Sequence, residues 1–93
     1  MWVRIDEMSF DSDHAREVIE HVRNTAVVKH DGEDFRGFRL LMDEPNGRGL
    51  DVSYWDSELG ARTGASDPST FPVGVAAMTV VRSNVYEMSI DSV

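Results

Sequence analysis

Two stretches of the chain alternate apolar residues with side chains that could do chemistry. In residues 2–8 (WVRIDEM) and 50–55 (LDVSYW), the alternating partners are aromatic, charged or hydroxyl-bearing: Trp2, Arg4, Asp6, Asp51, Ser53 and Trp55. In a cavity, a buried carboxylate can accept a substrate proton, and tryptophan rings can contact an apolar ligand. Such a set on one sheet face indicates a small-molecule cavity.

The alternation itself predicts strands. Period-two patterns predict them at residues 2–8, 35–43 and 50–55, and a fourth in the C-terminal segment, where Tyr86, Met88 and Ile90 alternate most clearly. Asn46–Gly47 supplies the positive φ that a hairpin between the second and third strands requires.

Helical spacing predicts two helices. The more regular one runs from Asp13 to Thr25, behind capping residues at positions 11–13. A shorter one is expected from Ser57 to Ala65, where two glycines weaken the helix. Residues 66–74, with two prolines and a glycine, are expected to form a loop.

The element order βαββαβ predicts one domain over residues 1–93, a ferredoxin-like α+β fold with both helices on one face of an antiparallel sheet. The helices are expected to cover an apolar face made of Val3, Ile5, Phe38, Leu40, Met42, Leu50, Val52, Tyr54, Tyr86, Met88 and Ile90. The opposite face would then carry polar residues and large aromatics: Trp2, Arg4, Asp6, Arg39, Leu41, Asp51, Ser53, Trp55, Glu87 and Ser89.

Two interpretations of this mixed face stay open. It is either a solvated face, on which Trp55 is a surface aromatic or a plug at the end of the sheet, or the wall of a cavity in a dimer whose sheets pack face to face. The cost of exposing Trp2, Leu41 and Trp55 together favours the cavity.

Composition excludes several classes of partner. Seventeen acidic residues against nine basic ones give a net charge of −8, which repels nucleic acid and anionic membranes. The chain has no cysteine, no apolar run of about 18 residues and no signal-peptide pattern, so a cytoplasmic location is expected. A core this small favours a homodimer.

At residues 35–61 (FRGFRLLMDEPNGRGLDVSYWDSELGA) the chain resembles the antibiotic-biosynthesis-monooxygenase-like family of dimeric α+β barrels. The shared features are a Gly-Phe element opening a strand, a hairpin, and an alternating strand that ends in tryptophan before a polar residue, Ser and Glu. The resemblance implies a homodimer with a pocket between each sheet and its helices or loops. It does not imply one reaction.

Family members include cofactor-free oxygenases of phenolic or quinol-like substrates and haem-degrading enzymes. The resemblance implies that Trp55 corresponds to the tryptophan of the family motif. It places Asp51 where one branch of the family has an amide side chain. Asp51 is either a proton acceptor or a solvated carboxylate. Ala61 replaces the aromatic hydroxyl of that branch, which weakens the oxygenase assignment. No histidine follows His30, so the imidazole ligand of the haem-degrading branch is missing.

These observations predict a monooxygenase-like protein that binds a small aromatic or apolar molecule without metal or organic cofactor. The alternative is a noncatalytic ligand-binding or interaction module on the same fold. Asp51 and Trp55 are the expected catalytic residues, and the expected substrate-binding residues are Trp2, Arg4, Asp6, Arg39 and Ser53. No metal site is expected, because His14 and His21 are about two helical turns apart.

Overall fold

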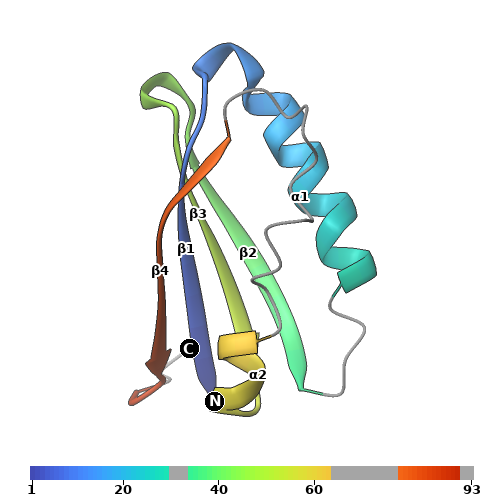
Figure 1. Ribbon diagram of the computed structural model, residues 1–93, viewed down its shortest axis with the longest axis vertical. Coiled ribbons are helices and arrows are strands. Elements are labelled where there is room, and N and C mark those ends of the chain that lie inside the picture. The colour runs from blue at the N-terminus through green and yellow to red at the C-terminus, as the bar shows by residue number, and fades with distance from the viewer. Residues whose placement is uncertain (30–33, 64–77, 91–93) are drawn as a thin grey trace.

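The computed structural model describes residues 1–29, 34–63 and 78–90 (Figure 1). Its elements are β1 (Trp2–Ser9), a 3-10 turn (Ser12–His14), α1 (Ala15–Lys29), β2 (Phe35–Asp43), a second 3-10 turn (Glu44–Asn46), β3 (Arg48–Trp55), α2 (Glu58–Thr63) and β4 (Thr79–Glu87). The predicted βαββαβ order is confirmed. The expected loop at residues 66–74 and the expected end of the second helix at residue 65 lie outside the described residues.

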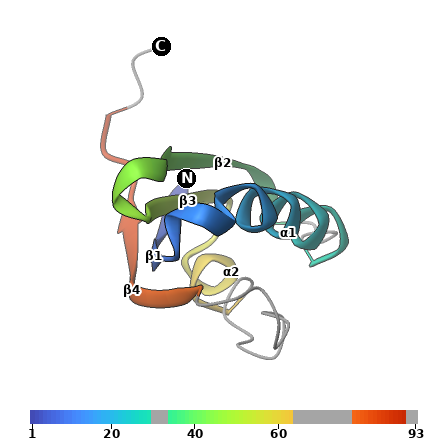
Figure 2. The same ribbon diagram turned by 90° about the horizontal axis from the view of Figure 1, so that it is seen from above.

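The four strands form one antiparallel sheet in the order β2-β3-β1-β4. Both helices lie on the same face, α1 along β2 and α2 beside the start of β1 and the end of β3 (Figures 1 and 2). The predicted ferredoxin-like α+β fold is therefore confirmed.

The main core lies between α1 and the sheet. Ala15, Val18 and Val22 recur at helical spacing, are buried, and cluster with Met8 and Phe10. The partly buried hydrophobic residues packed against this cluster are Phe38, Leu40, Met42 and Met78. The α1 helix begins at Ala15, after the 3-10 turn, whose first residues are capped by the Asp11 carboxylate accepting from the Asp13 amide at 3.0 Å.

The β2–β3 hairpin turns at Gly47, which has the predicted positive φ, at 62°. A β-carbon at this position would collide with the carbonyl oxygen of Phe10. The Phe10 amide in turn donates to the carbonyl of Gly47 at 2.9 Å, so the hairpin is fastened to the end of β1. Glycine is required here by both its backbone angle and this close approach.

The prediction of which face the helices cover is wrong for β1 and β3. Arg4 pairs with Ser53 and Asp6 with Asp51, so these residues share a face. Arg4, Asp6, Ser53 and Trp55 are all buried, which places them on the helix side. The apolar residues of β1 and β3 lie on the open face instead: Val3, Ile5, Leu50, Val52 and Tyr54.

The prediction that Phe38, Leu40 and Met42 of β2 face the helices is correct. The residues of β1 and β3 predicted to share that face with them are wrong. Phe38 pairs with Ser53 and Leu40 with Asp51, while Leu41 pairs with Leu50 on the open face. The register shifts between Phe35 and Gly37, and Gly37 has a φ of 129°. The helix-covered face is consequently apolar along β2 and polar in the middle of β1 and β3, at Arg4, Asp6, Asp51 and Ser53.

Candidate functional site

A buried hydrogen-bond network centres on Arg4 of β1. Its Nε donates to both carboxylate oxygens of Asp6, at 3.1 and 3.2 Å. Its Nη1 donates to the carbonyls of Ala61 and Arg62 in α2, at 3.1 and 3.0 Å, and its Nη2 donates to the Ser83 hydroxyl at 2.8 Å. Ser83 also hydrogen-bonds to Asp6. Arg4 and Asp6 are only 6% and 8% exposed.

This network explains how charged residues can lie under a helix. A buried charge is tolerated when it is paired and its remaining donors are satisfied. The alternation in β1 places Arg4 and Asp6 on one face, but their partners Ala61, Arg62 and Ser83 lie 57 to 79 residues away from Arg4 along the chain. Ser83 was missed by sequence reasoning, because it is an exposed strand serine and no local pattern distinguishes it from others of that kind.

Trp55, at the end of β3, lies inside the molecule and is 4% exposed. Its indole Nε1 donates to the Ser53 hydroxyl at 2.9 Å. The ring of Phe35 meets it edge-on, with centroids 5.2 Å apart and an interplanar angle of 64°. Trp2, half-buried, is its register partner on β1. The interpretation of Trp55 as a surface aromatic is therefore wrong; the plug and the cavity wall remain as alternatives.

An apolar hollow of about 330 Å³ lies between α1 and β2. Its lining residues are Ile19, Val22, Arg23, Phe38, Leu40 and Met42. Leu40 is the register partner of Asp51, and Asp51 is in turn the partner of Asp6. The carboxylate of Asp51 therefore belongs to the same sheet face as the floor of the hollow, one strand away from it.

A second hollow, of about 350 Å³, lies beside the Arg4 network and is lined by Arg4, Arg62, Ser83, Asn84 and Val85. Together the two hollows flank the polar strands β1 and β3 on the helix-covered side. Six of the seven predicted site residues share this face: Trp2, Arg4, Asp6, Asp51, Ser53 and Trp55.

Arg39, the seventh predicted residue, lies on the open face. Its register partner is Val52, its Nη1 donates to the Tyr54 hydroxyl at 3.0 Å, and its guanidinium lies 5.5 Å from the centre of the Tyr54 ring. The structure therefore separates Arg39 from the other six residues.

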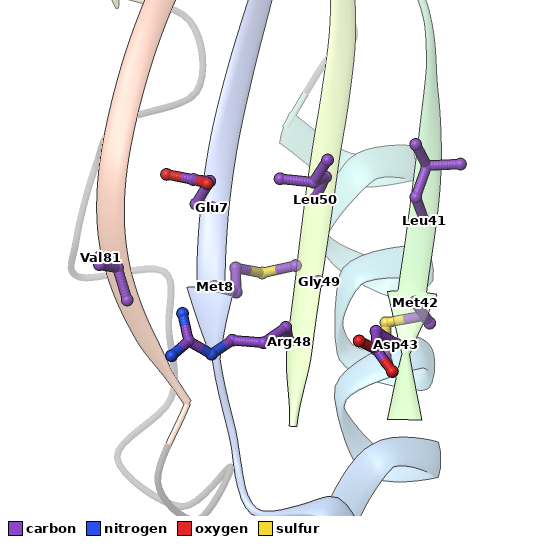
Figure 3. Close-up of a pocket in the computed structure, with 9 residues that line it drawn as sticks. All are labelled: Glu7, Met8, Leu41, Met42, Asp43, Arg48, Gly49, Leu50 and Val81. Carbon is purple, nitrogen blue, oxygen red and sulfur yellow. The ribbon is translucent and has the colours of Figure 1, made fainter. Parts of the chain in front are cut away.

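The open face carries a hollow of its own, of about 340 Å³, toward the hairpin end of the sheet (Figure 3). Its lining combines apolar and charged residues: Glu7, Met8, Leu41, Met42, Asp43, Arg48, Gly49, Leu50 and Val81. Glu7 forms an ion pair with Arg82 at 3.5 Å. Most of its lining belongs to the face opposite Asp51 and Trp55, and none of the seven predicted site residues lines it.

An exposed ion pair holds the start of β2 to the residue after Trp55. Arg36 Nε donates to a carboxylate oxygen of Asp56 at 2.8 Å, and the Asp56 amide donates to the carbonyl of Asp34 at 2.8 Å. The hydrogen bond from Arg36 lowers the pKa of Asp56 below its usual value. The same contact raises the pKa of Arg36.

Metal-ligating side chains do not gather in the described ranges: no three His, Asp or Glu residues there lie in a metal-binding arrangement. His14 contacts Glu17 at 3.1 Å on the surface of the helical segment. Among the described residues, no helix is long and apolar enough to cross a membrane.

Two solved structures have the same fold. One, from Deinococcus radiodurans and provisionally named an antibiotic biosynthesis monooxygenase, has a TM-score of 0.73 and 15% identity, over 99% of this chain and 96% of that one. The other is a mutant of MhuD with two manganese protoporphyrin IX molecules bound per active site, with a TM-score of 0.68 and 18% identity over 99% and 98% of the two chains. No protein-family model and no curated protein matches the sequence.

The comparison confirms the predicted resemblance at the level of fold: the chain folds as antibiotic-biosynthesis-monooxygenase-like proteins do. One fold supports many reactions, so the activity has to be argued from the site.

Proposed function

We propose that this protein is a cytoplasmic, homodimeric, monooxygenase-like protein that binds a small aromatic or apolar molecule on the helix-covered face of its sheet. The observation that carries the proposal is the apolar hollow between α1 and β2, whose floor residue Leu40 is the cross-strand neighbour of Asp51. A volume of about 330 Å³ lies at the lower end of the range for small-molecule pockets. An apolar wall next to a carboxylate suits a ring that carries an acidic hydroxyl.

In this proposal Asp51 accepts a proton from the bound substrate. The resulting carbanion reduces dioxygen without a cofactor: one oxygen atom replaces two hydrogens of a CH₂ group as a carbonyl, and the other leaves as water. The protein supplies orientation and exclusion of water. Phe38 and Leu40 hold the ring, and Trp55 closes the far end of the same face.

A noncatalytic ligand-binding module is the second candidate, and Ala61 favours it. This residue takes the place of an aromatic hydroxyl in the cofactor-free oxygenases that the sequence resembles, and it is fully buried against the Arg4 network. A hydroxyl is therefore missing at that point of α2, and the chain would then bind its ligand without turning it over.

A porphyrin, as bound by the mutant MhuD, fits this chain poorly. Its histidines are His14, His21 and His30, all before β2. His14 lies at the start of the α1 segment, paired with Glu17, and α2 contains no imidazole.

Asp51→Asn tests the catalytic proposal. With 1-naphthol as the binding probe, we expect its quenching of tryptophan fluorescence to be unchanged in the variant. With anthrone as the substrate, whose ring CH₂ group would become a carbonyl in the proposed step, we expect oxygen uptake above the buffer rate to fall about 100-fold or more, within the range for loss of a general base. The exposed Asp13→Asn is the matched control and should behave as the unaltered protein.

The outcomes separate the two candidates. Binding without oxygen uptake in the unaltered protein would favour the noncatalytic module. Oxygen uptake that is equal in Asp51→Asn and the control would remove Asp51 from the chemistry. Absence of naphthol binding would contradict both candidates for this class of ligand.

A further inference from the structure

The Arg4 network joins three separate parts of the fold. Arg4 and Asp6 belong to β1, Ser83 belongs to β4, and the two accepting carbonyls belong to the last turns of α2. Four interactions of one guanidinium thus converge where the helix meets the sheet. The planar, forked geometry of arginine makes this possible, since no other side chain presents five donors in fixed directions.

Within the described residues, α2 has little hydrophobic contact to hold it in place. It is six residues long, below the length at which an isolated helix is stable, and Ala61 is its one buried residue. Leu59 is 72% exposed, so this hydrophobic side chain does not anchor the helix within the described structure. The last carbonyls of a helix have no intrahelical partner and favour a nearby cation, which Arg4 provides.

We infer that Arg4, Asp6 and Ser83 form a latch that fixes α2 over the Trp55 end of the sheet. In this inference Arg4 is a positioning residue: it acts through α2 and does not contact the ligand. Asp6 holds the guanidinium from the strand side, and Ser83 holds both Arg4 and Asp6 from β4. The relevance of the latch to ligand binding rests on the proposed function, whereas its effect on α2 does not.

Amide hydrogen exchange of the ligand-free protein tests the latch directly. Arg4→Met keeps most of the apolar stem and removes every donor. We expect protection of the α2 amides of Ala61, Arg62 and Thr63 to fall about tenfold or more, while α1 amides around Val18 and Val22 keep their protection. Arg16→Met, an exposed arginine on α1, is the matched control and should change neither group.

Two further variants distinguish a latch from a general loss of stability. Arg4→Lys keeps the charge but presents one ammonium group that cannot serve Asp6, both carbonyls and Ser83 together, so α2 protection should stay low. Ser83→Ala removes the hydrogen bonds of the Ser83 hydroxyl to Arg4 and Asp6 and should lower α2 protection less than Arg4→Met does. Because Ser83→Ala leaves the Arg4–Asp6 pair in place, it remains informative if Arg4→Met does not fold.

The inference would be overturned by a uniform loss of protection in α1 and α2, by unchanged α2 protection in Ser83→Ala and Arg4→Met, or by full rescue in Arg4→Lys. A loosened α2 with unchanged 1-naphthol binding would support the latch and separate it from the proposed ligand site.

Discussion

Trp55 has two kinds of neighbour, and they give it two separate roles. The edge-on ring of Phe35 belongs to packing, whereas the hydrogen bond from its indole to Ser53 fixes which way the ring faces. A buried indole N–H needs a hydrogen-bond acceptor whether the ring only packs in the core or also contacts a ligand. The hydrogen bond to Ser53 therefore does not distinguish these two roles. The stability contribution and the ligand contribution of Trp55 have to be measured apart.

Trp55→Ala should lower the free energy of unfolding by ~3–5 kcal/mol, because it removes a large side chain that is almost fully buried. Urea denaturation followed by circular dichroism checks this value. Trp2→Ala is the matched control; its side chain is only half-buried, so the loss should be smaller. An unfolding midpoint equal to that of the unaltered protein would show that Trp55 is not part of the core.

At the residue scale, sequence reasoning identified which residues of a strand share a face better than it identified their contacts. Alternation placed Trp2, Arg4 and Asp6 on one face of β1, and the register with β3 agrees. The prediction places Arg39 on that face too, because it aligns Arg39 of β2 with Ser53 and Trp55 of β3. In the structure Arg39 pairs with Val52, on the other face. Ser83 could not be found, since its importance comes from Arg4, which is distant in sequence.

Among the elements, the junction between β2, β3 and α2 depends on exposed polar contacts. Arg36 reaches Asp56 just after Trp55, and the Ser57 hydroxyl donates to the Asp34 carboxylate at 2.9 Å and accepts from the Gly60 amide at 3.0 Å. These bonds connect the start of β2 to the first turn of α2. The helix is thus held at its beginning by exposed polar groups and at its end by Arg4.

The Arg36–Asp56 contact predicts a pH dependence. Because the folded pKa of Asp56 is depressed, its contribution to stability is present above the unfolded value near 3.8 and is lost as the pH falls through the lower folded pKa. Arg36→Met should remove this contribution, so the variant's Tm should lie slightly below that of the unaltered protein at pH 6, and the difference should shrink as the pH falls below 3.8. A Tm difference that does not shrink over this range would contradict this origin.

At the element scale, the order of strands and helices followed from periodicity and turn residues, but the covered face did not. Alternation reports which residues share a side and leaves open which side is buried. Polarity predicted that Arg4 and Asp6 lie on the face opposite the helices. They are buried because α2 and β4 satisfy their hydrogen bonds, and that compensation is a tertiary effect.

At the scale of the whole molecule, the sheet face that no helix covers among the described residues carries a group of apolar side chains. Leu41 and Tyr86 are each 52% exposed there, beside the half-buried Val3, Ile5 and Val52. Contiguous exposed apolar surface on a small protein marks an interaction site. A second copy of the chain can cover it, and the small core of one chain gives a reason for the pairing.

Sedimentation at micromolar concentration should therefore give a mass of about twice 10.4 kDa. Leu41→Glu places a charge on the apolar face and should shift the protein toward monomer. Leu59→Glu is the matched control, because Leu59 is exposed on α2, on the helix side of the sheet. A monomer at every concentration, or equal effects of the two substitutions, would contradict a dimer built on the open face.

The position of β1 between β3 and β4 has a consequence for how the chain is made. On the ribosome, residues 2–9 emerge before residues 79–87, so one edge of this strand has no partner until the later segment has been synthesised. Pairing across such a sequence separation is slow, because a long loop must close before any contact forms. The sheet is therefore completed only after the β4 residues leave the exit tunnel, and until then β1 offers an unpaired edge to chaperones.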